Sequence, residues 1–350
     1  MANIKIGLKA FFNARAILHD MSSVIEKLNY HRACNILKLF FSNKLSRITS
    51  KYFHSGKPWS LSIETTSVCN LNCPQCACGM GLIQRSAAFI DISLFEHILN
   101  DIPSTCFYLN LYFQGEPLLH PRFEELVSLA ASKGFYTSIS TNAQLIDQQK
   151  ADQIICSGLN RIIISLDGLT EKDYSSYRIG GEVNKAMNAI AYLNQARKKS
   201  GSKKPLIIAQ MLLTKDTEPH YKAFYRIAKN LGADLAICKT MQLMSLDENS
   251  AKKYLPVKKA FSRYKTNENG IPVPVHNKGI KACSRLWHSA VITSDGCVVP
   301  CCYDKCPEYV MGNIGKDRFL DIWNSNEMLA FRKQTIDASS LPSICRNCKP

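Results

Sequence analysis

The chain has 350 residues, a length that suggests two domains and is ample for a full hydrophobic core without a framework of disulfides. Hydrophobic residues make up 46% and charged residues 21%, an ordinary globular balance that excludes wholesale disorder. No run approaches the roughly 18 uncharged apolar residues of a membrane span, so an integral membrane protein is excluded as well. Fifteen cysteines and a formal net charge of +16 are the unusual features.

Residues 1–54 predict a basic helical arm. They carry nine Lys or Arg residues against two acids, Asp20 and Glu26, and their apolar residues recur at helical spacing. Such an arm is either a solvated packing element or a contact for a membrane surface or an acidic partner. The amino terminus does not read as a secretory signal, because it lacks a continuous apolar region and a small-residue cleavage site. We therefore expect a cytoplasmic protein, in which cysteine clusters indicate metal or catalysis rather than disulfides.

Residues 55–243 predict an α/β domain. Short apolar runs alternate with helical stretches, which is the pattern of parallel βαβ units. With short, right-handed connections, the strands form either a partial barrel or an open sheet. Six strands are expected: Leu61–Thr65, Phe107–Phe113, Phe135–Ser140, Arg161–Leu166, Pro205–Leu213 and Leu235–Leu243.

Several helix ends in this domain are legible. Asp91 is expected to cap a helix, and Pro121 to occupy the first position of the next one. Gly134 is expected to follow the last turn of that second helix. Thr217 is expected to cap, and Gly232 to close, a later helix.

The remaining chain predicts a connector and a small carboxy-terminal domain. Residues 244–280 are basic, hold three prolines and show no clear alternation, so we expect a connector there. Residues 281–350 hold seven of the fifteen cysteines and are expected to form a separate unit. Within it, two apolar runs flank Ser294-Asp295-Gly296, which predicts a β-hairpin with a tight turn.

The first cysteine group has the spacing C-x3-C-x2-C and consists of Cys69, Cys73 and Cys76, just after the first expected strand. Three thiolates on one short loop can hold three irons of a [4Fe–4S] cube and leave the fourth iron open for a ligand. The alternative is a zinc site, which needs four closed ligands, with Cys78 or a distant residue as the fourth. Zinc sites usually consist of two C-x2-C pairs, so we favour iron.

This loop resembles that of the radical S-adenosylmethionine (radical SAM) superfamily, and the resemblance extends over residues 59–243. It implies a partial (β/α)6 TIM-like barrel in which the open iron chelates SAM. It also implies that Glu116, Asn142, Ser165 and Arg178 position SAM. The full set of implied cofactor-binding residues, at successive strand ends, is Gln114, Gly115, Glu116, Pro117, Ser140, Asn142, Ser165, Asp167 and Arg178.

Two positions depart from the pattern of that family. Gln75 stands before the third cysteine, where an aromatic residue near the adenine is frequent. Gln114 replaces the first glycine of the family's Gly-Gly-Glu-Pro element. The adenine contacts are the part of the resemblance that these changes affect.

The second cysteine group has the spacing C-x17-C-x43-C-x2-C and could hold tetrahedral zinc or a fully ligated [4Fe–4S] cube. It resembles the SPASM domain, or its shortened twitch form, that follows many radical SAM cores. The chain ends two residues after the last of these cysteines, so we expect one auxiliary cluster. The expected ligands are Cys283, Cys301, Cys345 and Cys348, with Cys297, Cys302 and Cys306 as spare or alternative ligands. The other cysteines are expected in the core: Cys34, Cys106, Cys156 and Cys238.

The resemblance implies an enzyme that cleaves SAM to a 5′-deoxyadenosyl radical and abstracts hydrogen from a C–H bond in a net oxidation. The substrate is either a peptide or protein side chain, or a sugar or other small metabolite. Flavodoxin or ferredoxin would donate the electron. The alternative class is a non-catalytic zinc, iron–sulfur or nucleic-acid-binding protein, although the basic runs lack the interleaved aromatics typical of single-strand binding. No catalytic base is singled out among Asp167, Tyr177 and His288.

Overall fold

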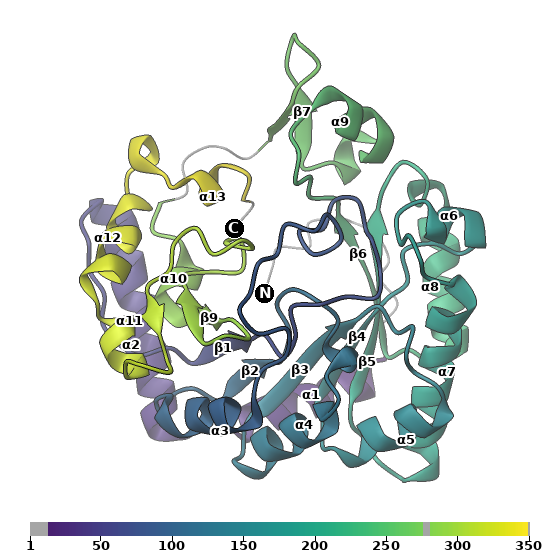
Figure 1. Ribbon diagram of the computed structural model, residues 1–350, viewed down its shortest axis with the longest axis horizontal. Coiled ribbons are helices and arrows are strands. Elements are labelled where there is room, and N and C mark those ends of the chain that lie inside the picture. The colour runs from purple at the N-terminus through teal and green to yellow at the C-terminus, as the bar shows by residue number, and fades with distance from the viewer. Residues whose placement is uncertain (1–12, 276–280, 349–350) are drawn as a thin grey trace.

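The computed structural model describes residues 13–275 and 281–348. The first twelve residues of the expected arm, residues 276–280 of the expected connector and the last two residues lie outside this range. Strands of the described chain form a nine-stranded sheet of order β11-β10-β9-β1-β2-β3-β4-β5-β6. In Figure 1 its parallel part curves into an arc with helices on the outside, which is the expected partial barrel.

All six expected strands of the α/β domain are present and parallel to their neighbours. The structure shortens most of them by one to three residues, because the polar turns that carry the site begin where the pairing ends. The strands are β1 (Ser60–Ile63), β2 (Tyr108–Asn110), β3 (Tyr136–Thr141), β4 (Arg161–Ser165), β5 (Leu206–Leu213) and β6 (Leu235–Thr240).

Helices cover the convex side of this sheet. Asp91 caps α3 as expected, accepting a hydrogen bond from the Ser93 amide at 2.8 Å. Gly134 and Gly232 follow α4 and α8 with φ angles of +82° and +93°, a backbone region that glycine adopts without strain. The elements are α3 (Ile92–Asp101), η1 (Pro117–Leu119), α4 (Phe123–Ser132), α5 (Gln148–Cys156), α6 (Glu171–Ser175), α7 (Val183–Lys199), η2 (Glu218–His220) and α8 (Tyr221–Leu231).

Two expected helix starts were wrong. Pro121 precedes the N-cap residue Arg122, so α4 begins two residues beyond the proline. Thr217 does not cap α8, because its hydroxyl accepts from the Thr214 amide at 2.8 Å and donates to the Leu212 carbonyl at 2.6 Å. That turn is followed by the single turn of η2 before α8 starts.

The two faces of the strands differ in polarity. Residues paired in register point to the same side, so Ser62, Asn110, Ser138 and Arg161 share one face. The Asn110 amide donates to the Ser62 hydroxyl across that face at 3.4 Å. The concave side is therefore a lumen that is polar along β1 to β3, whereas the apolar Ile163, Ile208 and Leu235 face it from β4 to β6. The alternate residues are apolar and buried beneath the helices: Leu61, Leu109, Ile139, Ile162 and Ile207.

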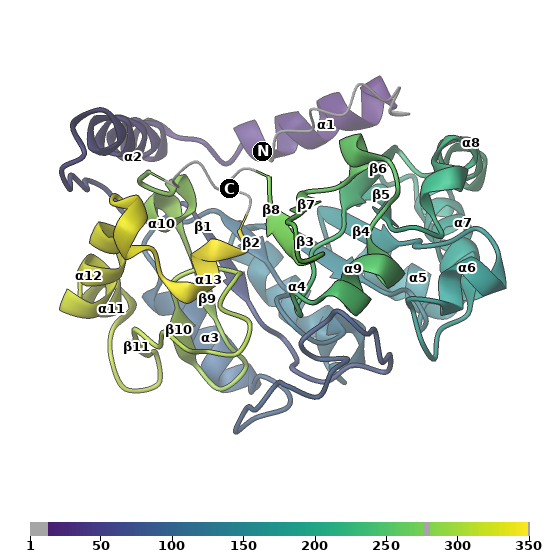
Figure 2. The same cartoon turned by 90° about the horizontal axis from the view of Figure 1, so that it is seen from above.

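The amino-terminal arm forms two helices, α1 (Ala14–Ile25) and α2 (Tyr30–Thr49). From α1, the buried Asp20 side chain pairs with Arg161 and with the Tyr136 hydroxyl, both at the amino ends of their strands. Hence α1 closes the amino end of the barrel. Figures 1 and 2 place α1 and α2 on the same side of the molecule. None of the helices within the described ranges is long and apolar enough to cross a bilayer.

The expected connector is more ordered than its sequence suggested. It contains a seven-residue helix, α9 (Glu248–Tyr254), and a short antiparallel hairpin. Asp247 caps α9 by accepting from the Ser250 amide at 2.7 Å, a local signal that apolar alternation does not reveal. The other elements are η3 (Lys259–Phe261), β7 (Tyr264–Thr266) and β8 (Pro272–Pro274).

The carboxy-terminal region continues the sheet of the barrel. Strand β9 (Ser289–Ile292) pairs with β1 in parallel, and β10 (Cys297–Val299) pairs with β9 in the expected hairpin. Gly296 in its turn has a φ angle of +82°. Backbone pairing therefore crosses the domain boundary expected near residue 281. The other elements are α10 (Ser284–His288), β11 (Gly312–Asn313), α11 (Phe319–Trp323), α12 (Asn326–Gln334), η4 (Ala338–Ser340) and α13 (Ser343–Arg346).

Candidate active site

The first cysteine loop follows β1 at the carboxyl end of the parallel strands, where βα loops assemble active sites. Two side chains aim N–H groups at its sulfurs. The Asn142 amide donates to Cys69 Sγ at 3.7 Å, and Arg178 Nη1 donates to Cys73 Sγ at 3.8 Å. The Leu71 backbone amide donates to Cys69 Sγ at 3.4 Å. Such donors stabilise thiolates of an anionic iron–sulfur cluster, so the residues present fit that group.

The surroundings of Cys69 and Cys73 favour the protonated thiols when no metal is bound. Burial raises the pKa of Cys73 to about 11, although the Arg178 guanidinium acts in the opposite direction. A hydrogen bond with Cys78 raises the pKa of Cys69 further above its usual range, and burial adds to this. Cluster assembly would therefore release protons.

Cys78 is a fourth thiol beside the triple. Its Sγ donates to the Ser67 carbonyl at 3.3 Å, and it contacts Cys69. Within the described ranges, His, Cys, Asp and Glu side chains form no group of three or more that could hold a single metal ion. The thiols are thus not arranged as a closed tetrahedral zinc site, which holds four ligands at about 2.0–2.3 Å from one ion.

Glu116 joins the ends of two neighbouring strands. Its carboxylate accepts from the Thr141 hydroxyl at 2.6 Å, the Asn142 backbone amide at 2.7 Å and the Leu118 backbone amide at 3.1 Å. Burial raises its pKa, while these hydrogen bonds act to lower it. Gly115 before it lies so close to the cysteine loop that a Cβ atom would be 2.4 Å from the Thr66 carbonyl oxygen. Only glycine fits there.

Arg178 reaches the loop from the other side. Its Nε donates to Asp167 Oδ2 at 2.6 Å, and Asp167 Oδ1 accepts from the Leu212 amide at 2.5 Å. Asp167 thereby fixes the guanidinium between β4 and β5. The other expected SAM contacts lie at the same end of the strands, on or next to β2, β3 and β4: Gln114, Pro117, Ser140 and Ser165.

Gln75, one of the two departures from the family pattern, makes hydrogen bonds to residues 244–250. Its side-chain oxygen accepts from the Met244 amide at 2.7 Å and the Ser245 amide at 3.3 Å. Its nitrogen donates to the Ser250 hydroxyl at 3.2 Å. These bonds connect the cysteine loop to α9. Gln75 and Ser250 are 175 residues apart in the sequence, which contains no local signal for this contact.

The second cysteine group comes together although its members are far apart in sequence. Burial raises the pKa of Cys345 to about 12 and that of Cys348 to about 11, and the nearby Cys283 thiol raises both. Burial raises the pKa of Cys301 as well, with further contributions from Cys302, Cys283 and Cys345. Cys283 and Cys345 therefore each lie near the other three expected ligands.

The alternative ligands differ in position. Cys302 lies beside the group and accepts a hydrogen bond from Arg285 Nη1 at 2.8 Å. Cys297 instead accepts from the Asn313 amide at 3.5 Å, and Cys306 lies next to Lys305.

All fifteen cysteines, each of which lies in a described range, are free thiols. Of those assigned to the core, Cys106 and Cys238 are buried. Cys34 is half-buried and Cys156 is exposed, so the assignment was wrong for Cys156, which ends α5 at its solvent side.

A cavity of about 170 Å³ opens in the lumen beside the second cysteine group. Its lining combines hydroxyl, amide and imidazole groups with one guanidinium. The lining residues are Ser60, Ser62, Asn110, Arg285, His288, Ser289, Val291, Pro300, Cys301 and Cys302.

Two lysines missed by sequence reasoning lie between the cysteine groups. Lys239 of β6 is close enough to Arg285 and Cys302 for their charges to act on its pKa, and Lys305 is similarly close to Cys76 and Cys302. Burial lowers the pKa of both lysines. A single lysine at a lumen-facing position of the otherwise apolar strand β6 is the signal that could have identified Lys239.

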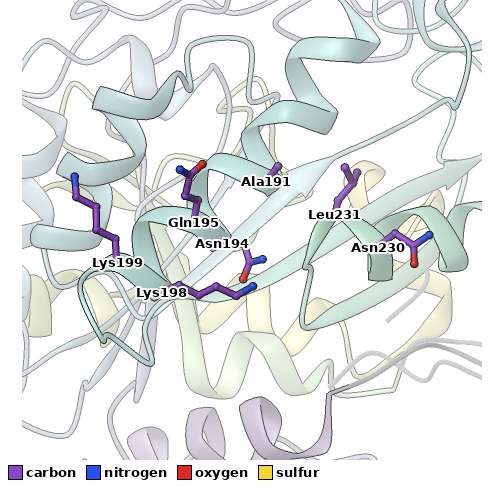
Figure 3. A pocket seen from close by; sticks show the side chains of 7 residues that line it. All are labelled: Ala191, Asn194, Gln195, Lys198, Lys199, Asn230 and Leu231. Carbon is purple, nitrogen blue, oxygen red and sulfur yellow. The ribbon is translucent and has the colours of Figure 1, made fainter.

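A cavity of about 630 Å³ lies elsewhere. Figure 3 shows that its lining comes from α7 and α8, on the outer surface of the barrel. It contains none of the expected site residues and no acid or cysteine. The lining residues are Ala191, Asn194, Gln195, Lys198, Lys199, Asn230 and Leu231.

Two family profiles match the chain. The profile of the radical SAM superfamily matches residues 63–225, and that of the SPASM iron-sulfur cluster-binding domain matches residues 283–349. The first match contains the C-x3-C-x2-C loop, and the second contains the other four expected ligands.

Relatives align over most of the chain. The tungsten-containing aldehyde ferredoxin oxidoreductase cofactor-modifying protein of Pyrococcus furiosus is 27% identical over 316 residues, covering 82% of this chain and 86% of the relative. PqqA peptide cyclase of Gluconobacter oxydans is 24% identical over 307 residues, covering 83% of each.

Solved structures share the fold. The structure of anSMEcpe with bound AdoMet gives a TM-score of 0.56 at 20% identity and covers 83% of this chain and 86% of that one. SuiB of Streptococcus suis bound to S-adenosylmethionine gives 0.57 at 16% identity and covers 79% and 66%. The expected resemblance is confirmed: the chain belongs to the radical SAM superfamily and is an enzyme of that class with a C-terminal SPASM iron-sulfur domain.

Proposed function

We propose that the chain holds a SAM-binding [4Fe–4S] cluster through Cys69, Cys73 and Cys76 and modifies a side chain of a peptide or protein by net oxidation. One observation carries the proposal: a three-cysteine loop, N–H donors to its sulfurs and a polar lumen meet at one end of the strands. When bound, the iron and SAM supply an electron and a 5′-deoxyadenosyl radical, and a second cluster supplies an acceptor for the electron released by oxidation.

The residues around the loop suit the amino acid part of SAM. Glu116 offers a carboxylate to an ammonium group, and Arg178 offers a guanidinium to a carboxylate, so the pair has the charges that a zwitterion needs. Gly115 lets the backbone approach closely, and Asn142 lies against the same loop. Gln114, Pro117, Ser140, Ser165 and Asp167 complete the proposed binding set.

We assign one auxiliary [4Fe–4S] cluster to Cys283, Cys301, Cys345 and Cys348. The proximity of Cys283 and Cys345 to the other two supports this choice over sets that include Cys297 or Cys306. The Arg285 guanidinium donates to the neighbouring Cys302 and would stabilise a negatively charged cluster.

The lumen cavity supports a substrate group of modest size. At about 170 Å³ it suits one side chain or a small metabolite. The relative from Gluconobacter is named for its action on a peptide, which favours the peptide proposal. The serine hydroxyls of the lining favour a second candidate, a sugar or similar polyol. Free thiols throughout the chain suit the reducing cytoplasm, where flavodoxin or ferredoxin could donate electrons.

Anaerobic reconstitution tests the proposal. Two cubes would give about eight irons and eight sulfides per chain. With dithionite and SAM, the loaded protein should release 5′-deoxyadenosine. Cys73→Ala should abolish that release, Cys345→Ala should largely retain it, and the exposed Cys156→Ala is the matched control.

Two results would contradict the assignment. One is protein prepared without oxygen that carries no labile sulfide. The other is a Cys345→Ala variant that loses all SAM cleavage while its first cluster is filled. The substrate class is then tested with short peptides encoded beside the gene and with sugars, by asking which of them increases 5′-deoxyadenosine release and is itself altered in mass.

A further inference from the structure

Helix α2 turns a mostly polar side toward the protein, with Leu39 as its one buried apolar residue, and turns an apolar side outward. Surface helices normally bury the apolar side. Here Asn35, Asn43 and Ser46 are at most 7% exposed, whereas Phe41 is 63% and Ile48 is 79% exposed. The outward apolar residues follow one another at helical spacing of three or four positions: Leu37, Phe41, Leu45 and Ile48.

The inward polar side chains fix this orientation. The Asn35 amide donates to the Lys57 carbonyl at 2.8 Å, and the Asn43 amide donates to the Ala282 carbonyl at 2.9 Å. The Ser46 hydroxyl donates to the Phe53 carbonyl at 2.8 Å. Rotating α2 to bury its apolar side would break all three bonds, so the outward apolar stripe is a stable feature of the fold.

Helix α1 repeats the arrangement. Its buried residues are the polar Asp20 and Ser23, while Leu18, Met21 and Ile25 are 64%, 48% and 59% exposed. Both helices lie along one side of the molecule in Figures 1 and 2. The exposed apolar residues of α1 and α2 are called the apolar face below. Exposed apolar patches of this extent mark interaction sites.

Charges around the apolar face indicate what covers it. Helix α2 contains no acid, and its exposed cations Lys38, Lys44 and Arg47 alternate with the apolar stripe. Lys44 Nζ lies 5.7 Å from the Phe40 ring centroid. A second copy packing face to face would bring like charges together, which is unfavourable. An anionic surface would instead be attracted to them.

We propose that the apolar face of α1 and α2 docks the enzyme on an anionic lipid surface, with apolar side chains inserted at the interface and cations against the headgroups. Because α1 closes the amino end of the barrel, docking would leave the carboxyl end, with both cysteine groups, free for substrate. The proposal does not rest on the identity of that substrate.

Sedimentation of the full, cluster-loaded chain with vesicles tests the proposal. It should bind vesicles of equal parts phosphatidylglycerol and phosphatidylcholine, bind phosphatidylcholine alone weakly, and lose affinity as salt rises. Leu37→Gln combined with Ile48→Gln should weaken binding by at least about tenfold, because each of these side chains would otherwise leave water. Release of 5′-deoxyadenosine should not change.

Matched controls separate docking from general effects. Val257→Gln removes an apolar side chain that is 72% exposed elsewhere and should leave vesicle binding unchanged. Changing Lys38, Lys44 and Arg47 to Gln should weaken binding more than changing the exposed lysines Lys172, Lys265 and Lys316. No binding to anionic vesicles would overturn the proposal. The proposal would also be overturned if the chain formed a dimer in solution and Leu37→Gln/Ile48→Gln split that dimer without changing vesicle binding. A second copy would then be what covers the apolar face.

Discussion

At the residue scale, Glu116 shows why a buried carboxylate can be both structural and functional. Three donors, one from η1 and two from the end of β3, converge on its two oxygens. The motif around Glu116 could be recognised in the sequence because Gly115 and Pro117 are its chain neighbours. Its partner Thr141 could not, because that contact depends on how two parallel strands end side by side.

We predict that Glu116→Gln weakens SAM binding by roughly 10- to 100-fold. The new amide nitrogen must face at least one N–H or O–H donor, and an unsatisfied buried group costs about 1–3 kcal/mol. The check is the dissociation constant for SAM together with iron content, which should stay at the wild-type value. Glu125→Gln, on the exposed side of α4, is the control. Unchanged SAM affinity would exclude a role of the carboxylate in the site.

The second residue-scale prediction concerns pH. His54 lies against the rings of Trp287 and Trp323, with centroid distances of 6.0 and 5.6 Å. Burial, and then the nearby Arg332, lower its pKa to about 3. Below the unfolded value of about 6.5 the unfolded chain binds a proton that the folded chain does not, so the free energy of unfolding falls as pH decreases.

We therefore predict that His54→Phe flattens this dependence. As pH falls from 6 to 4, the free energy of unfolding of the variant relative to wild type should rise by about 1.4 kcal/mol for each pH unit. Denaturant titrations at several pH values provide the measurement. His31→Phe, the same substitution at an exposed histidine, is the matched control. A constant difference for His54→Phe would mean that the imidazole is protonated in the folded protein.

At the scale of elements, predictability followed the strength of the local pattern. The strands of the barrel were predicted because continuous apolar runs such as Leu206–Leu213 are long and bounded by turns. Helix α9 was missed because its seven residues bury only Ala251 and Tyr254 and show no apolar periodicity. Its position depends on the tertiary contact with Gln75, which no local signal encodes.

We predict that Gln75→Ala loosens α9. Three hydrogen bonds between the cysteine loop and residues 244–250 are lost, each worth about 0.5–1.5 kcal/mol. Amide hydrogen exchange of Glu248–Tyr254 should accelerate by roughly 10- to 100-fold while exchange in β1 stays unchanged. Gln84→Ala, an exposed glutamine beyond the same loop, is the control. Equal exchange in both variants would show that other contacts hold α9.

At the scale of the whole molecule, one sheet joins the barrel to the SPASM region through β1 and β9. The cysteine spacing predicted the two cysteine groups, but the polar lumen between them emerges only when strands are placed in register. The same holds for the closed amino end, where Asp20 from α1 meets residues that begin β3 and β4. The contacts that close the amino end join residues more than a hundred positions apart.

We predict that Asp20→Asn destabilises the closed amino end of the barrel. Removing one partner of a buried ion pair costs about 3–5 kcal/mol, and because the Arg161 side chain is 26% exposed we expect a smaller loss, about 2–3 kcal/mol. Denaturant unfolding measures the loss, and limited proteolysis between α1 and α2 reports release of the arm. Glu26→Gln, the exposed acid of the same segment, should have little effect.

The double variant Asp20→Asn/Arg161→Gln should be no less stable than Asp20→Asn alone, because no unpaired charge then remains in the lumen. Additive losses in that double variant would show that Asp20 and Arg161 stabilise the barrel independently, and that α1 is held by its other contacts, such as the hydrogen bond from the Asn13 amide to the Asp234 carbonyl at 2.7 Å.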